Sequence, residues 1–186
     1  TRNQNMLRHV FYWCEECGSA LAEAEVEYAD KESKAIDFLF PIKPDQTKAI
    51  FNNASSENIF VASWTTTPWT IPSNKAICFN SKFSYELIEL KFKGKILNLI
   101  ICSDLIDATL ERYELDKYKK LGKVTGDELA GLICHHPFLD QESPLISGDH
   151  VTKEMGTGFV HTAPAHGLED YEACKDTDID LTSPVK

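Results

Sequence analysis

The sequence predicts an α+β fold in which a mixed, barrel-like sheet carries a few short helices on its margin. Three observations support this class. Segments rich in β-branched and aromatic residues follow one another through the middle of the chain, helical periodicity is confined to short stretches, and Gly and Pro interrupt the C-terminal part. With 186 residues and 42% hydrophobic composition, the chain can build one domain with a sizeable core.

The first strands are predicted before residue 81. The stretch "ESKAIDFLFPI" (32–42) indicates a strand that ends at Pro41, and "NIFVASW" (58–64) indicates a second one, because both are rich in strand-forming residues. The segment "KAICFN" (75–80) continues the β signal. We therefore expect a sheet to begin in this part of the chain.

A hairpin and a helix are predicted next. Residues 84–102 indicate two strands that turn at 93–95, where a glycine lies between two lysines. The apolar period changes to helical spacing within 103–121, and Ser103 or Asp104 can cap the start of the helix.

The C-terminal third carries weaker signals. Residues 122–138 are expected to begin with a turn and a short helix, and 148–167 alternate weakly between apolar and polar residues. The segment "LEDYEACKD" (168–176) indicates a short acidic helix.

The domain organisation is predicted as an entry strand and linker over 1–35, followed by the main domain over 36–186. The chain opens at Thr1 with its first methionine at position 6, which suggests a piece of a longer polypeptide. No apolar stretch approaches the length of a membrane span, so we expect a soluble, cytoplasmic protein without a membrane partner.

The charge balance restricts the possible partners. Nineteen basic residues against twenty-nine acidic ones give a net charge of −10, which does not support a broad nucleic-acid-binding surface. Any contact with nucleic acid must be local. Most of the six cysteines are scattered among apolar residues, which favours reduced, buried thiols over a disulfide framework.

The segment "VASWTTTPWT" (61–70) places three threonines directly before a proline. Pro68 and Pro72 disfavour helical backbone at the residues before them, so the chain is expected to leave the preceding strand as an extended, irregular loop. Three adjacent hydroxyls bring hydrogen-bonding groups without charge, which suits an ester, a ribose or a water. The alternative is that threonine is simply a good strand residue.

Two longer strings carry a resemblance. "WTTTPWTIPSN" (64–74) and "GTGFVHTAPAHGLEDY" (156–171) resemble the two halves of the editing pocket inserted in isoleucyl-tRNA synthetases, and "YWCEECGSALAEAEVEY" (12–28) resembles the strand that enters this insertion. The related valyl and leucyl enzymes typically carry an arginine where Thr67 stands. Neither signature sequence of the synthetic site is present, so this segment is not expected to activate amino acids.

The resemblance assigns roles to residues of the site. Thr65, Thr66 and Thr67 would orient the terminal adenosine and a water, Asp170 would bind the α-ammonium group of the aminoacyl ester, and His161 would form a wall that restricts side-chain size. From the residues alone, Asp170 could instead stabilise the helix dipole and His161 could be a core residue.

Other substrate-binding positions come from the same two strings. Gly156 allows close approach of the backbone to a ligand beside Thr157, although both could serve an ordinary turn. By resemblance, Asn74 helps to hold the terminal nucleotide, whereas Trp64 could line the pocket or serve packing. Glu169 is expected to face solvent.

Cys14 and Cys17 have the spacing of a zinc knuckle, but a structural zinc ion needs four ligands. Cys134 with His135 and His136 could complete the site, although adjacent residues rarely reach one metal. The resemblance places the partner pair beyond the present C-terminus. We therefore expect at most a zinc half-site and no cofactor in this segment, with ATP used by the synthetic domain of a full-length protein.

The expected function is proofreading by hydrolysis. The resemblance implies deacylation of Val-tRNA(Ile), and also hydrolysis of valyl-adenylate, with the tRNA 3′ end and the rest of the synthetase as partners. No covalent nucleophile is expected, because no Ser or Cys in either string has a base beside it.

Two other classes remain open. A free-standing trans-editing deacylase would need its own tRNA-binding elements, which the acidic composition disfavours. A non-catalytic module that binds the tRNA 3′ end would not need Asp170. Within the family, a leucyl or valyl identity is disfavoured by Thr67 and His161.

Overall fold

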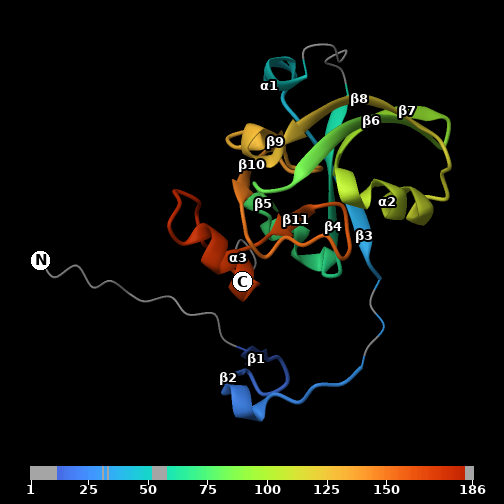
Figure 1. Ribbon diagram of the computed structural model, residues 1–186. Coiled ribbons are helices and arrows are strands. Elements are labelled where there is room, and N and C mark those ends of the chain that lie inside the picture. Colours follow the sequence, from blue (N-terminus) through green and yellow to red (C-terminus); the bar gives the residue numbers. More distant parts are fainter. Residues whose placement is uncertain (1–11, 31, 33, 52–57, 183–186) are drawn as a thin grey trace, which may run out of the picture.

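The computed structural model describes residues 12–30, 32, 34–51 and 58–182, and Figure 1 shows their arrangement. Within these ranges the strands form two separate sheets. The smaller is an antiparallel hairpin of β1 (Tyr12–Cys14) and β2 (Ser19–Leu21), followed by the 3-10 helix η1 (Glu23–Glu25), and it lies apart from the main body in Figure 1. The predicted boundary near residue 35 stays a prediction, and residues 1–11 of the entry segment lie outside the described residues.

The main body contains the other elements. In chain order these are β3 (Ile36–Pro41), α1 (Pro44–Ile50), β4 (Ile59–Thr65), η2 (Pro68–Ser73), β5 (Ala76–Phe79), β6 (Ser84–Phe92), β7 (Lys95–Cys102), η3 (Ser103–Leu105), α2 (Ile106–Arg112), β8 (Tyr118–Thr125), η4 (Gly126–Leu129), β9 (Ile133–His135), β10 (Glu142–Ser147), β11 (Phe159–Thr162) and α3 (Leu168–Cys174).

The main sheet has nine strands in the order β8-β6-β7-β4-β11-β5-β10-β9, with β3 paired to β4. Strand β4 is central because it has three neighbours. Antiparallel β3 pairs with residues 60–65, parallel β7 pairs with residues 59–61, and parallel β11 pairs with Trp64 near its end. The sheet is mixed and curls into a half-barrel with a few short helices, which confirms the predicted α+β class.

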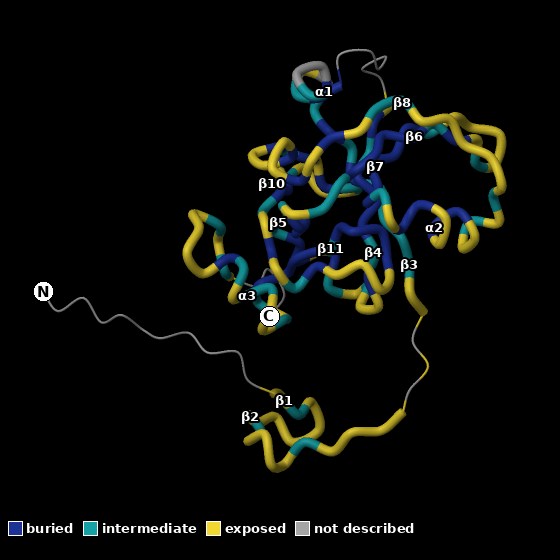
Figure 2. The backbone as a smooth tube through the Cα atoms, viewed as in Figure 1, coloured by how far each residue is buried: buried dark blue, intermediate teal, exposed yellow. Residues whose placement is uncertain are grey.

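Two apolar clusters stabilise this sheet. The larger contains fully buried Phe40, Phe79, Tyr85 and Phe159, and the smaller lies where Ile106 and other residues of α2 pack on the sheet. Figure 2 shows buried backbone running through the centre of the main sheet, whereas the β1–β2 hairpin is mostly exposed. Burial of each large apolar side chain contributes about 1.5–3 kcal/mol, so these clusters hold the site elements in place.

The predicted hairpin is confirmed. β6 and β7 are joined by Lys93 and Gly94, both with positive φ values of 48° and 82°. Positive φ at both central residues is the type I′ geometry, which matches the right-handed twist of paired strands.

Several predicted elements differ from the structure. The helical part of 103–121 ends at Arg112, and residues 118–121 belong to β8, which extends through 122–125 where we predicted a turn. Glu114 has a positive φ of 57°, so the backbone leaves the helical region there. The short helix predicted after this turn is the 3-10 helix η4, and the acidic helix at 168–176 is confirmed as α3.

The loop after β4 also differs from its prediction. Residues 68–73 form η2, a 3-10 helix with Pro68 at its start and Pro72 inside it. A proline can begin such a helix because its missing N–H has no partner there. Thr66 and Thr67 before η2, and Asn74 and Lys75 after it, remain irregular. No helix among the described residues is both long and apolar enough to cross a membrane.

Candidate functional site

The two predicted motifs meet at one end of the main sheet. β4 and β11 are parallel neighbours, and Trp64 lies opposite Val160. Thr65 is the last residue of β4 and His161 the last but one of β11, so both lie close to where their strands end. Parallel strands end at the same edge of a sheet, and polar groups carried there can reach one ligand.

The threonine stretch forms a compact turn. Thr65 is buried, and its Oγ1 atom accepts a hydrogen bond of 3.0 Å from the N–H of Thr67. The hydroxyls of Thr65 and Thr67 are 3.2 Å apart. Thr66 and Thr67 are exposed. The buried hydroxyl therefore shapes the turn, and the exposed part of the turn carries the next two hydroxyls.

His161 is held by hydrogen bonds at both ring nitrogens. Nε2 lies 3.0 Å from Oγ1 of Thr70, and Nδ1 lies 2.8 Å from Nδ2 of Asn74. The Thr70 hydroxyl donates its single hydrogen to the carbonyl of Thr67, so His161 must be the donor to Thr70. Burial, together with repulsion from two neighbouring histidines, lowers the pKa of His161 to about 4. The ring is therefore neutral near pH 7 and has no free nitrogen to act as a general base.

Asn74 is fully buried, and its amide is engaged by the protein. Nδ2 donates to the carbonyl of Ala76 at 2.7 Å and faces His161, while Oδ1 accepts from the hydroxyl of Ser143 at 2.6 Å. The side chain of Gln141 also donates to the Asn74 carbonyl. The contact with a nucleotide that the resemblance implies for Asn74 stays a prediction.

A backbone hydrogen bond holds Asp170 at the end of β11. Its Oδ2 atom accepts a hydrogen bond of 2.8 Å from the N–H of Ala163. Burial raises the pKa of Asp170, an effect that this backbone donor opposes. An added Cβ at Gly167 would lie only 3.1 Å from Oδ2, so glycine leaves room for the carboxylate. Nε2 of His166 lies 2.9 Å from Oγ of Ser73, which ties this segment to η2.

The glycines of the second motif allow close packing. Gly156 and Gly158 have φ values of 84° and 83°, and a Cβ at Gly158 would lie 2.2 Å from Cβ of Cys102. Thr157, between them, is fully buried, and its hydroxyl donates to a carbonyl of β4. These three residues anchor the segment to the sheet, and their contact with a substrate stays a prediction.

A cavity of about 210 Å³ lies beside the motif residues, lined in part by Trp64, Gly156, Val160 and Glu169. Glu169 is exposed, as predicted. Trp69, in η2, is 70% exposed, so its indole is not used for packing in this chain. Residues of both motifs therefore line the cavity, whereas Trp69 does not.

Sequence reasoning missed several residues that organise this region. Thr70 and Ser73 lie within the first string, and His166 within the second, but their partners are set by the fold. Ser143 lies in a segment for which we predicted no element. It follows Gln141 and Glu142 and precedes Pro144, a context that gives no local signal of its burial or its partner.

The cysteine pair forms a tight turn between β1 and β2. The N–H of Cys17 donates to Sγ of Cys14 at 3.2 Å, and Gly18 has a φ of 62°. Hydrogen bonds from Cys17 lower the pKa of the Cys14 thiol, which suits a metal ligand. Among the described residues, however, no group of three or more His, Cys, Asp or Glu side chains could hold a metal ion, and Cys134 is buried in the core. The zinc half-site stays a prediction.

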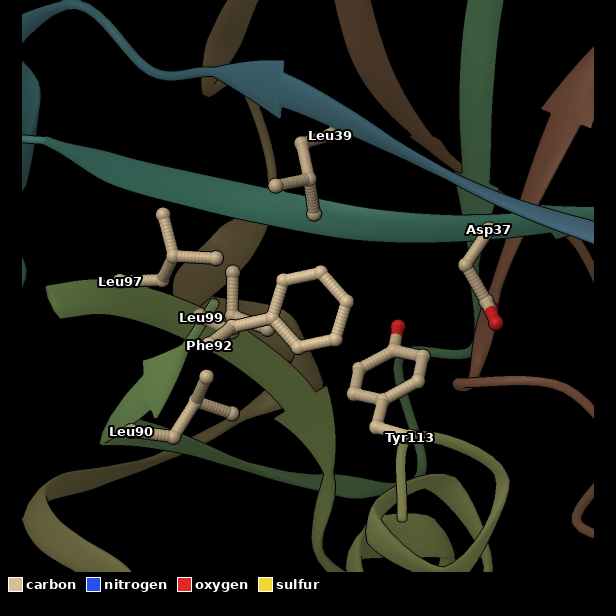
Figure 3. Close-up of a pocket in the computed structure, with 7 residues that line it drawn as sticks. All are labelled: Asp37, Leu39, Leu90, Phe92, Leu97, Leu99 and Tyr113. Atoms are coloured by element: carbon tan, nitrogen blue, oxygen red, sulfur yellow. The ribbon is translucent and has the colours of Figure 1, made fainter. Parts of the chain in front are cut away.

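Figure 3 shows a second cavity, of about 130 Å³. Leucines of β3, β6 and β7 line it with Phe92, Tyr113 and Asp37. The Asp37 carboxylate accepts two hydrogen bonds, of 3.1 and 3.3 Å, from Nη2 of Arg112. None of the predicted site residues lines this cavity.

Comparisons with known proteins give consistent results. No family model matches the chain. Isoleucine–tRNA ligases of Colwellia psychrerythraea and Lawsonia intracellularis are 44% and 47% identical over 178 and 174 residues, which is 94% of this chain but 19% and 18% of theirs. The chain therefore spans about a fifth of the length of these relatives.

Solved structures agree in fold. A structure described as GlLeuRS-CP1 has a TM-score of 0.64 at 15% identity and covers 77% of this chain and 59% of its own. The editing domain of the Plasmodium knowlesi cytosolic leucyl-tRNA synthetase has a TM-score of 0.60 at 15% identity and covers 78% and 64%. At this identity the likeness shows the fold alone.

Proposed function

The chain belongs to the isoleucine–tRNA ligase family and matches one segment of its members, and we propose that this segment is a hydrolytic editing domain. Its substrate is Val-tRNA(Ile), and valyl-adenylate is hydrolysed at the same site. Its partners are the 3′ end of tRNA(Ile) and the rest of the ligase, and it acts in the cytoplasm.

One observation carries this proposal. Thr65 is the last residue of β4, His161 is the last but one of the parallel neighbour β11, and the N–H of Ala163 holds Asp170 at the end of β11. A carboxylate and several uncharged hydroxyls thus gather at one sheet edge from distant parts of the sequence. Such a set can bind the ammonium group of an aminoacyl ester while leaving the carbonyl open to water.

The chemistry is attack by a positioned water. The exposed hydroxyls of Thr66 and Thr67 orient the terminal ribose and the water. Covalent catalysis is disfavoured because burial raises the pKa of the two thiols that interact with Asp170, that of Cys78 to about 12 and that of Cys174 to about 11. In addition, His161 has no nitrogen free to activate a hydroxyl. Backbone N–H groups stabilise the developing oxyanion.

Selection depends on size. One methylene in an apolar pocket is worth about 1–3 kcal/mol, a general value for which isoleucine and valine are the usual example, so a first pocket cannot reject valine well enough. His161, fixed at both nitrogens, serves as a rigid wall that excludes the larger side chain from the second pocket.

The terminal nucleoside occupies the neighbouring cavity. Its volume of about 210 Å³ and its position next to Glu169, the neighbour of Asp170, support this placement. The negative charge of the chain fits a contact limited to the end of the tRNA.

The test is deacylation of Val-tRNA(Ile) by a full-length ligase that carries this segment. Asp170→Asn removes the charge but keeps the shape, and we expect a rate about 10- to 100-fold lower, from the loss of a charge-assisted hydrogen bond. Glu172→Gln removes an exposed charge of the same helix that does not line the cavity, and serves as the control. Equal rates for Asp170→Asn and the unchanged enzyme would reject the proposal.

A further inference from the structure

A chain of hydrogen bonds leads from β10 to the threonine turn. The hydroxyl of Ser143 contacts Oδ1 of Asn74 at 2.6 Å, Nδ2 of Asn74 contacts Nδ1 of His161 at 2.8 Å, and Nε2 of His161 contacts the Thr70 hydroxyl at 3.0 Å. The Thr70 hydroxyl then reaches the carbonyl of Thr67 at 2.8 Å. Ser143 and Asn74 are fully buried, so water does not replace these contacts.

The chemistry of the two ends fixes the direction of every bond. The Thr67 carbonyl can only accept, so Thr70 donates to it and accepts from Nε2–H of His161. At the other end, the Asn74 amide group faces two acceptors, the Ala76 carbonyl and Nδ1 of His161. Turning the amide over would place its oxygen against the Ala76 carbonyl. His161 is therefore confined to the neutral tautomer that carries its proton on Nε2.

Ser143 is the residue that completes this arrangement from outside both sequence motifs. Its hydroxyl gives the Asn74 oxygen a donor, while Gln141 on the same hairpin holds the Asn74 backbone carbonyl. Without Ser143, the buried Asn74 oxygen would lack this partner, and the amide would be free to tilt or turn over.

We propose that Ser143 and Asn74 are positioning residues that hold His161 in a single tautomer and orientation, and so define the size wall. The proposal deepens the function proposed above and rests on it for its consequence. Asn74 then influences which aminoacyl side chain the pocket accepts, and it does so through His161, because its own amide is already bonded to protein groups.

The tautomer can be measured without any substrate. We would record ring-nitrogen NMR spectra of this chain with isotopically labelled histidine at neutral pH and assign His161 by the signals that disappear in His161→Gln. The unchanged chain should show two well-separated ring-nitrogen signals, with the unprotonated Nδ1 downfield. Ser143→Ala should narrow this separation, because the tautomers begin to exchange.

Asn74→Asp gives the sharpest contrast. A carboxylate of the same shape accepts a proton from Nδ1, so both ring nitrogens should move to the position of protonated nitrogens. If this variant does not fold, the spectrum of Ser143→Ala, which removes a single hydroxyl, is sufficient to test the positioning role. Ser63→Ala is the matched control, since Ser63 is equally buried but bonds to the carbonyl of Phe159.

The outcomes separate the two proposals. A His161 spectrum in folded Ser143→Ala that is identical to that of the unchanged chain overturns the positioning role, as does a control variant with the same shift. Loss of the tautomer in Ser143→Ala should also raise hydrolysis of Ile-tRNA(Ile) in the full-length ligase. If the spectrum changes while the unchanged ligase never deacylates Val-tRNA(Ile), the positioning role stands and the proposed function fails.

Discussion

The N–H of Ala163 and the Oδ2 atom of Asp170 lie 2.8 Å apart in a hydrogen bond that joins α3 to the end of β11. The position of the carboxylate is thereby set by the sheet rather than by the short helix that carries it. The space next to it is just as important, because Gly167 places no Cβ against Oδ2.

Gly167→Ala should therefore impair the site more than the fold. The backbone there has a φ of −139°, which any residue can adopt, so the added methyl acts only through its contact of 3.1 Å with Oδ2. We expect deacylation of Val-tRNA(Ile) to fall by about tenfold, as for a misplaced catalytic group, with little change in melting temperature. An unchanged rate would show that the carboxylate can move without consequence.

Removal of the wall should relax the size selection. His161→Ala opens the space that the imidazole fills, and the proposed function then predicts that Ile-tRNA(Ile) becomes a substrate. From the cost of one methylene we expect its hydrolysis to rise by about 10- to 200-fold relative to that of Val-tRNA(Ile). The measurement is the ratio of the two deacylation rates, and a constant ratio would contradict the role of His161.

The stability of the chain should fall on mild acidification. The pKa of His161 is about 4 in the folded chain against an ordinary value of 6.5. Between these values the unfolded state binds a proton that the folded state does not, so the free energy of unfolding decreases as the pH falls from 6.5 to 4. The full loss is about 3 kcal/mol.

Denaturant unfolding of the unchanged chain and of His161→Gln checks this slope. The slope should be shallower in the variant, although His136, whose pKa is also lowered, keeps part of it. Asp170 has the opposite effect on the free energy of unfolding. Its pKa is raised in the folded state, so the folded state binds a proton at a higher pH than the unfolded state does and gains stability as the pH falls. A variant with an unchanged slope would assign the acid sensitivity to other groups.

Gly158 and Gly131 provide a matched pair for the packing of the second motif. Their φ values are 83° and 81°, so alanine brings a similar backbone strain of about 1–2 kcal/mol at each position. A Cβ at Gly158 would collide with Cys102 at 2.2 Å, whereas nothing lies within 4 Å of one at Gly131. Gly158→Ala should lose a further 1–3 kcal/mol or so of unfolding free energy. Equal losses of unfolding free energy for the two variants would mean that the segment around Gly158 moves to accommodate the added Cβ without further cost.

The sequence was sufficient where local chemistry decides the structure. Residues 59–65 are strongly β-forming, and the two residues between β6 and β7 favour a tight turn, so both features were predicted. Strand β8 was missed because its lysine-rich sequence becomes a strand only by pairing with β6. The helical spacing that we extended to residue 121 thus ended sooner than its pattern indicated.

The candidate site was likewise predicted from the sequence only in part. Its motif residues were identified from two contiguous strings, and their meeting at one sheet edge follows from a strand pairing that no local signal specifies. Ser143 and Gln141 escaped notice because their role depends on the contact of the β10 hairpin with Asn74. Polar residues of this kind can be found only once their burial and partners are known.

The pairing of Trp64 with Val160 also bears on how the protein is made. The two residues are more than half of the chain length apart, so a nascent chain leaves the ribosome with β4 complete well before β11 exists. During that interval the last part of β4 has an open edge of the kind that other strands join, and the candidate site cannot assemble until β11 and α3 have emerged.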